Sequence, residues 1–151
     1  QYLAANTAAR VGVRVITHLG ACEVHERFTP ADIQQIRADH PGVTVLAHPE
    51  CPPEVVAEAN FAGSTAAMVD FVAVNQPKRV ALITECSMSD NVAQLYPQVE
   101  FIRPCNLCPH MKRNTLATIR RSLETMTHEV QIDAAVAERA KLAVDRMLAV
   151  K

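Results

Sequence analysis

Each of the five cysteines lies in a short polar segment that follows a predicted strand. Cys22 lies in "GACEVHERF", Cys51 in "HPEC", Cys86 in "TECS", and Cys105 and Cys108 in "CNLCPHMK". Thiolates are metal ligands and nucleophiles, so cysteines gathered at strand ends are candidates for chemistry. An odd number of cysteines at irregular spacing does not predict a disulfide framework, and we expect reduced thiols.

Three kinds of site are compatible with the CxxC pair Cys105 and Cys108. A thioredoxin-like redox pair uses both thiols. A structural zinc site needs four ligands, and this chain has only one such pair, although His110 is close enough in sequence to be recruited. An iron–sulfur cluster that acts as a Lewis acid needs three thiolates and an open iron, and its ligands can be far apart in sequence.

The "HPEC" segment offers an acid–base pair. Histidine is the side chain that titrates nearest neutral pH, and partial burial can raise the pKa of a glutamate such as Glu50. His48 and Glu50 are therefore predicted to transfer protons. The alternative is that they form a solvated turn with no function. Ser64 and Thr65 open a predicted helix after Gly63. Hydroxyls and free backbone N–H groups at such a position favour a carboxylate or phosphate, and simple N-capping is the alternative.

Composition excludes several classes of protein. The 151 residues carry a net charge of −1 with evenly scattered charges, and only two Tyr and four Phe are available to stack on bases, which argues against nucleic-acid binding. No apolar run approaches the roughly 20 residues that cross a bilayer, and the first residues lack the pattern of a signal peptide. We therefore predict a cytoplasmic protein that is not bound to a membrane.

Hydrophobic periodicity predicts alternating strands and helices. Short β-branched runs predict strands, and longer runs with helical spacing and capping residues predict helices. The class is therefore α/β with mostly parallel sheets. The predicted strands are 11–19, 43–48, 79–84 and 99–102, and the predicted helices are 2–9, 30–39, 52–60, 64–75, 87–96, 114–126 and 133–150.

A faint internal repeat suggests two domains. "RVITHLGAC" with "HPGVTVLAHPEC" and "RVALITEC" with "YPQVEFIRPCNLC" share an order of strand, cysteine, helix, turn and strand. The repeat predicts an α/β domain over 1–76 that carries Cys22 and the HPE motif. A second domain over 77–151 carries Cys108 and ends in a long helix.

Several motifs together resemble the second half of quinolinate synthase, the iron–sulfur enzyme of NAD biosynthesis. They are "GACEVHERF", "AHPECPPEVVAEANFAGST", "TECSM" and "CPHMKRNTL", in that order. The resemblance implies two similar three-layer αβα domains of a pseudo-threefold, three-domain architecture. It also implies that the preceding domain is missing, so that this chain is a truncated piece.

The resemblance implies a transferase reaction. Quinolinate synthase condenses iminoaspartate with dihydroxyacetone phosphate to form quinolinate, with loss of phosphate and two waters. L-Aspartate oxidase is the implied supplier of iminoaspartate. The implied cofactor is a 4Fe-4S cluster held by three cysteines, whose open iron acts as a Lewis acid. The piece alone is expected to bind iron weakly and to form no quinolinate.

The family's site residues map onto positions of this chain. Cys22 and Cys108 match two cluster ligands, and the third lies outside this chain. Cys105 is then dispensable, and Lys112 opens the next helix. His25 matches a family position, where we expect it to support the loop that carries Cys22.

The remaining matches concern substrate. His48 and Glu50 match the catalytic residues of the family's HPE motif. The implied substrate-binding residues are His48, Pro49, Glu50, Ser64 and Thr65.

Overall fold

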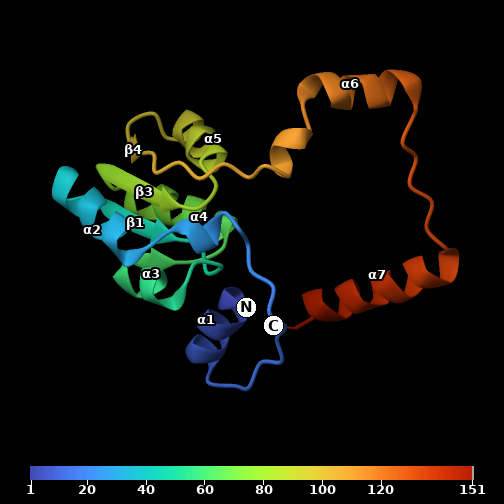
Figure 1. The fold of residues 1–151 in the computed structure, drawn as a ribbon, viewed down its shortest axis with the longest axis horizontal. Coiled ribbons are helices and arrows are strands. Elements are labelled where there is room, and N and C mark those ends of the chain that lie inside the picture. The colour runs from blue at the N-terminus through green and yellow to red at the C-terminus, as the bar shows by residue number, and fades with distance from the viewer. Residues whose placement is uncertain (151) are drawn as a thin grey trace. The chain divides into compact units, whose positions relative to one another are not determined.

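A computed structural model describes residues 1–150 of the chain (Figure 1). The chain forms two compact units, one over residues 1–112 and one from Arg113 onward. The first unit contains the sheet and all the predicted site residues, and the second contains two helices. Each unit is described by itself.

A four-stranded sheet forms the centre of the first unit. Its strands are β1 (Thr44–Ala47), β2 (Phe61–Ala62), β3 (Arg79–Ile83) and β4 (Glu100–Ile102). All neighbours are parallel, and the order is β2-β1-β3-β4. The predicted α/β class with a parallel sheet is confirmed.

Local signals explain where the helices begin. Thr29 caps α2 with a reciprocal capping box to Asp32, and Pro30 occupies the first helical position, where its missing N–H costs nothing. Short 3₁₀ turns flank the cysteine segments. The helices of this unit are α1 (Tyr2–Val11), α2 (Pro30–Asp39), α3 (Pro53–Glu58), α4 (Thr65–Asn75) and α5 (Ser87–Leu95), and the 3₁₀ turns are η1 (His25–Arg27) and η2 (Met111–Arg113).

Helices cover both faces of the sheet, which makes three αβα layers (Figure 1). Successive strand residues point to opposite faces, so one strand contributes to both halves of the core. On one face Val45, Ala47, Ala81 and Ile83 pack with Ile33 of α2 and Val55 of α3. On the other face Leu46, Val80 and Leu82 pack with Met68 and Val72 of α4 and Val92 of α5.

The second unit consists of α6 (Leu116–Thr125) and α7 (Ala134–Leu148). Thr115 caps α6 with a capping box to Thr118, and the Asp133 side chain accepts from an N–H of the first turn of α7. Both helices were predicted and are confirmed. Their apolar side chains are exposed; Leu116 and Leu123 are examples.

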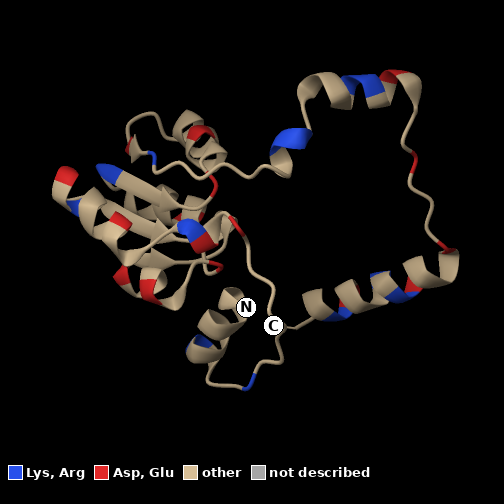
Figure 2. Ribbon diagram, viewed as in Figure 1, with Lys and Arg blue, Asp and Glu red and all other residues tan. Residues whose placement is uncertain are grey.

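Each unit has helices that carry both basic and acidic residues (Figure 2). No described helix combines the length and the apolar character needed to span a bilayer.

The repeat predicted a domain boundary after residue 76, but the structure does not divide the chain there. β1 and β2 precede that position and β3 and β4 follow it, yet β1 pairs with β3 along its whole length. The two halves of the repeat thus supply neighbouring strands of one sheet, and the units divide after Lys112.

The predicted strand 11–19 does not form. α1 runs through Val11, and the following residues are irregular, with Ile16 and Leu19 each 92% exposed. A strand needs a neighbour for its backbone N–H and C=O groups. No described strand lies beside this segment, so its β-branched residues are not enough to make it a strand.

Candidate active site

The sheet has a switch point between β1 and β3. The chain leaves β1 into α3 on one face and leaves β3 into α5 on the other, so the two connections diverge. Ligands of open parallel sheets bind in the crevice at such a point, outside the carboxyl ends of the strands. His48 follows β1 directly, and its backbone N–H donates to the Ile83 carbonyl of β3 at 3.1 Å.

Two histidines and a glutamate meet at this edge. The His25 and His48 rings stack with centroids 4.6 Å apart and planes 18° from parallel. Glu50 Oε2 lies 3.1 Å from His25 Nδ1 and 3.8 Å from His48 Nδ1. The His25 contact is close but too bent to be a well-formed hydrogen bond. The predicted pair His48 and Glu50 is thus brought together, with His25 as a third member.

Burial disfavours the charged form of both rings. It lowers the pKa of His25, an effect that nearby His48 reinforces and the Glu50 carboxylate opposes. It lowers the pKa of His48 as well, again against the pull of Glu50. Burial therefore favours the uncharged form of both imidazoles, in which the stack carries no like-charge repulsion.

This burial predicts how stability depends on pH. Because both pKa values are lowered by folding, the unfolded chain binds more protons, so the free energy of unfolding should fall as pH drops through about 6.5. Urea unfolding between about pH 8 and about pH 5 measures the slope. His25→Gln and His48→Gln should each flatten it, and His40→Gln, outside the site, should not. An unchanged slope in both site variants would contradict the assignment.

Cys22 completes a compact group of possible ligands. Its Sγ, a ring nitrogen of His25 and a carboxylate oxygen of Glu50 all lie within 4.8 Å of one another. Cys22 is a free, half-buried thiol. A pocket of about 400 Å³ is lined by Cys22, Glu50 and Gly20, among others. The predicted ligand and the predicted acid–base residue therefore open onto the same space.

The other predicted ligand lies on a loop that we call the CPHM loop (residues 105–112). Two contacts, one on each side of Cys108, join this loop to the GACEVH segment (residues 20–25). Asn106 Nδ2 donates to the Val24 carbonyl at 3.5 Å, and His110 Nε2 lies 3.1 Å from a Glu23 carboxylate oxygen.

The donor set fits a cluster in two respects. Cys22 and Cys108 are free, half-buried thiols on segments that contact each other. The Met111 backbone N–H points at Cys108 Sγ, with N and S 3.5 Å apart. Hydrogen bonds to sulfur of this kind tune cluster thiolates. The residues present therefore fit two cysteine ligands of an iron–sulfur cluster.

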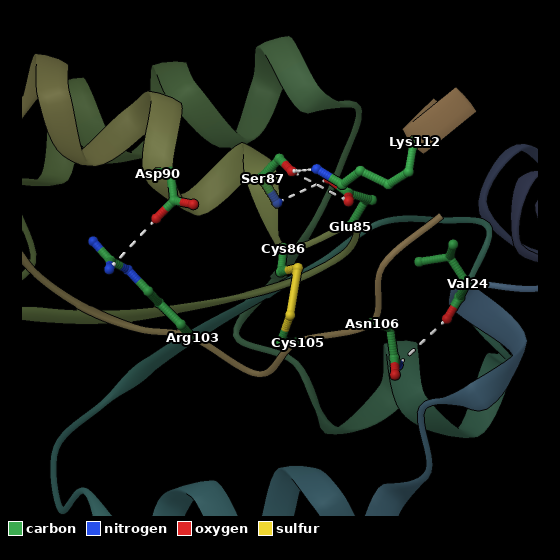
Figure 3. Close-up of a disulfide and its surroundings, with 9 residues drawn as sticks. All are labelled: Val24, Glu85, Cys86, Ser87, Asp90, Arg103, Cys105, Asn106 and Lys112. Atoms are coloured by element: carbon green, nitrogen blue, oxygen red, sulfur yellow. Dashed lines mark hydrogen bonds and ion pairs between the residues drawn. A yellow bond between two sulfur atoms is a disulfide. The ribbon is translucent and has the colours of Figure 1, made fainter. Parts of the chain in front are cut away.

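Cys86 and Cys105 form a disulfide, with Cα atoms 4.8 Å apart (Figure 3). The prediction that all thiols are reduced is wrong for this pair. The redox alternative expected Cys105 to pair with Cys108, but Cys105 bonds Cys86 and Cys108 is free. Cys86 follows β3 and Cys105 follows β4, and the carboxyl ends of these adjacent parallel strands meet at one edge.

Cys51 is a structural thiol. It is fully buried, its Sγ lies 3.5 Å from the Ile83 carbonyl, and burial raises its pKa to about 12. A thiol that stays protonated is a poor metal ligand and nucleophile.

Two anchors escaped sequence reasoning. Asn6 of α1 donates from Nδ2 to the carbonyls of Pro49 at 2.8 Å and Cys51 at 2.9 Å, which clamps the turn that carries Glu50. Lys112 Nζ donates to Ser87 Oγ at 2.9 Å and ties the CPHM loop to α5 (Figure 3). Asn6 was not singled out in the sequence. Lys112 was expected to open the next helix, but it lies in η2, and α6 begins at Leu116.

The predicted substrate hydroxyls lie elsewhere. Ser64 caps α4, because its Oγ accepts from the Ala67 N–H at 3.2 Å. It lines a pocket of about 620 Å³ together with Pro49 and Arg10. Thr65 is exposed at the start of α4. Substrate contacts for these two residues remain predictions.

Comparison with known proteins identifies the family of the chain. The family model described as "Quinolinate synthetase A protein" matches residues 1–149. Quinolinate synthase 2 of Mesorhizobium japonicum is 67% identical over 99% of this chain and 46% of the relative. The enzymes of Xylella fastidiosa strain Temecula1 and Caulobacter vibrioides strain NA1000 are 63% and 54% identical over 99% and 98% of this chain, and over 44% and 40% of the relatives. The chain spans less than half the length of these curated relatives, and it belongs to the quinolinate synthase family.

Proposed function

We propose that this chain contributes to a quinolinate synthase, which condenses iminoaspartate with dihydroxyacetone phosphate to give quinolinate, one phosphate and two waters. One observation carries the proposal beyond family membership. The candidate acid–base residue Glu50 and the candidate ligand Cys22 share one group within 4.8 Å, at the switch point of the sheet. Ring closure with two dehydrations needs protons removed and supplied beside a Lewis acid.

His48 and Glu50 are proposed as the acid–base residues. The Glu50 backbone N–H approaches His48 Nδ1 at 3.3 Å, so Nδ1 is the acceptor and the proton of the neutral ring sits on Nε2. His48 can then donate from Nε2 to a substrate oxygen. The Glu50 carboxylate, which is 36% exposed, can accept a proton from substrate carbon or nitrogen.

Cys22 and Cys108 are proposed as ligands of a 4Fe-4S cluster, with a third cysteine outside this chain. When bound, the cluster supplies an open iron that polarises a substrate oxygen and makes hydroxide a better leaving group. The chain's own part is to hold the two thiols on contacting segments and to place the acid–base residues beside them. Ser64 and Thr65 are proposed to hold substrate carboxylate or phosphate at the start of α4.

We also propose a cytoplasmic location and L-aspartate oxidase as the supplier of iminoaspartate. The family's role in NAD biosynthesis and the small-molecule substrates support both. In a reducing cytoplasm the Cys86–Cys105 disulfide would open to two neighbouring thiols.

A side-by-side preparation under nitrogen tests the proposal. Iron, sulfide and quinolinate formation are measured for the complete protein and for the 151-residue chain. We expect the complete protein to be brown and active. The chain alone, with two of three cluster thiolates, should lose iron to a chelator and form no quinolinate. A colourless, iron-free complete protein after anaerobic reconstitution would overturn the cluster. Full turnover by the chain alone would overturn the need for a third ligand.

A further inference from the structure

A buried polar pair lies behind the acid–base residues. His25 is 6% exposed and Thr84, which follows β3, is 4% exposed. Their side chains meet at 2.9 Å between His25 Nε2 and Thr84 Oγ1. Each partner of such a bond inside the core is costly to leave unpaired. The pair therefore fixes one edge of the His25 ring.

The opposite edge of the ring faces Glu50. An ionised carboxylate only accepts hydrogen bonds, so the proton of His25 belongs on Nδ1, 3.1 Å from Glu50 Oε2. Nε2 of the neutral ring is then an acceptor, and the Thr84 hydroxyl must be the donor. With this tautomer Thr84 donates to His25 Nε2, and the Nδ1–H of His25 faces the Glu50 carboxylate across a close but bent contact.

The face of the His25 ring also has a task. The His25 ring stacks on the His48 ring with centroids 4.6 Å apart. A His25 ring held in one orientation by Thr84 therefore also fixes the plane of the His48 ring. The charged and titratable groups around His25 are Glu50, His48 and Cys22, and the lowered pKa of His25 agrees with a neutral ring among them.

We propose that His25, oriented by Thr84, is a positioning residue that holds the Glu50 carboxylate and the His48 ring in working geometry. The inference rests on the proposed acid–base roles of Glu50 and His48. It assigns His25 more than support of the Cys22 loop. A misplacement of about 1 Å in a reacting group can cost about 100-fold in rate, which sets the scale of the expected effect.

Two isosteric substitutions distinguish the role of Nδ1 of His25 from that of Nε2. Asparagine places its amide N–H near the position of Nδ1, whereas glutamine places it near Nε2. In the complete protein, His25→Gln should lower kcat about 10- to 100-fold with little change in KM, and His25→Asn should restore much of the loss. Iron per chain should stay unchanged in both. Equal losses in the two variants, or loss of iron together with activity, would overturn a positioning role.

The tautomer offers a readout that does not depend on turnover. Long-range ¹H–¹⁵N correlation on the ¹⁵N-histidine-labelled 151-residue chain reports which ring nitrogen carries the proton, and His25→Gln assigns the signal. We expect the proton of His25 on Nδ1, with Thr84→Val perturbing this signal and the buried-serine control Ser89→Ala leaving it unchanged. A proton on Nε2 would overturn the inference.

The two experiments distinguish the inference from the proposed function. An Nε2–H tautomer together with an inactive Glu50→Gln variant would remove only the role of His25. Full activity of Glu50→Gln would remove the acid–base assignment itself, whatever the tautomer. If the chain gives no resolved histidine signals, the asparagine and glutamine variants of the complete protein still decide the question.

Discussion

Quinolinate formation by the complete protein should slow about 100-fold or more when Glu50 is replaced by glutamine, the usual scale for losing a positioned acid or base. Glutamine has nearly the same shape, and its amide oxygen can take the place of the carboxylate oxygen that lies 3.1 Å from His25 Nδ1. The variant loses the negative charge of the carboxylate and with it the ability to exchange a proton. The loss should therefore appear in kcat, with iron per chain unchanged.

A matched control lies four residues away. Glu54 is exposed in the first turn of α3, and Glu54→Gln removes the same charge from the same segment without touching the site. Its turnover should equal that of the parent protein. Normal turnover of Glu50→Gln, or an equal loss in both variants, would move Glu50 from catalysis to structure.

Replacement of Cys108 by serine should remove most of the iron and bring turnover to background. A serine hydroxyl is far less acidic than a thiol and is a harder donor, so it is a poor substitute for a thiolate on iron. The measurement is iron and sulfide per chain after anaerobic reconstitution, followed by quinolinate formation.

Cys105→Ser is the control for this experiment. It changes a cysteine three residues earlier on the CPHM loop and removes the bond to Cys86. The loop keeps its contacts from Asn106 to Val24 and from Lys112 to Ser87. We expect this variant to keep its iron and most of its activity. Full iron loading of Cys108→Ser would mean that another residue is the ligand.

The fold class could be predicted because local signals and periodicity agreed. Helix α2 has its cap, its proline and its apolar face in register, and β1 and β3 are short β-branched runs that become buried on both faces. β2 was missed because it has only two residues, Phe61 and Ala62, and its pairing with β1 defines it. Pairing between distant segments also explains the two other differences. Segment 11–19 has no neighbouring strand and is irregular, and the pairing of β1 with β3 joins the chain across residue 76.

The site could be predicted as far as strand ends allow. His48 and Glu50 follow β1, and every parallel strand delivers its next residues to the same edge. What sequence could not show is which strand ends are neighbours. The order β2-β1-β3-β4 places Thr84 beside the turn after β1 and Cys86 beside Cys105. Asn6 is a further case, since its partners are backbone carbonyls more than 40 residues away.

The anchors of the CPHM loop determine which changes in length it can tolerate. Asn106 is held near the start of the loop by the Val24 carbonyl, and Lys112 is held at its end by Ser87. Only two residue steps separate Asn106 from Cys108, a reach of at most about 7 Å. Side chains that are not anchors, such as the 48% exposed Leu107, are free to vary. An inserted or deleted residue would move Cys108 relative to these anchored residues. We therefore expect the amino acids of this loop to vary while its length stays constant.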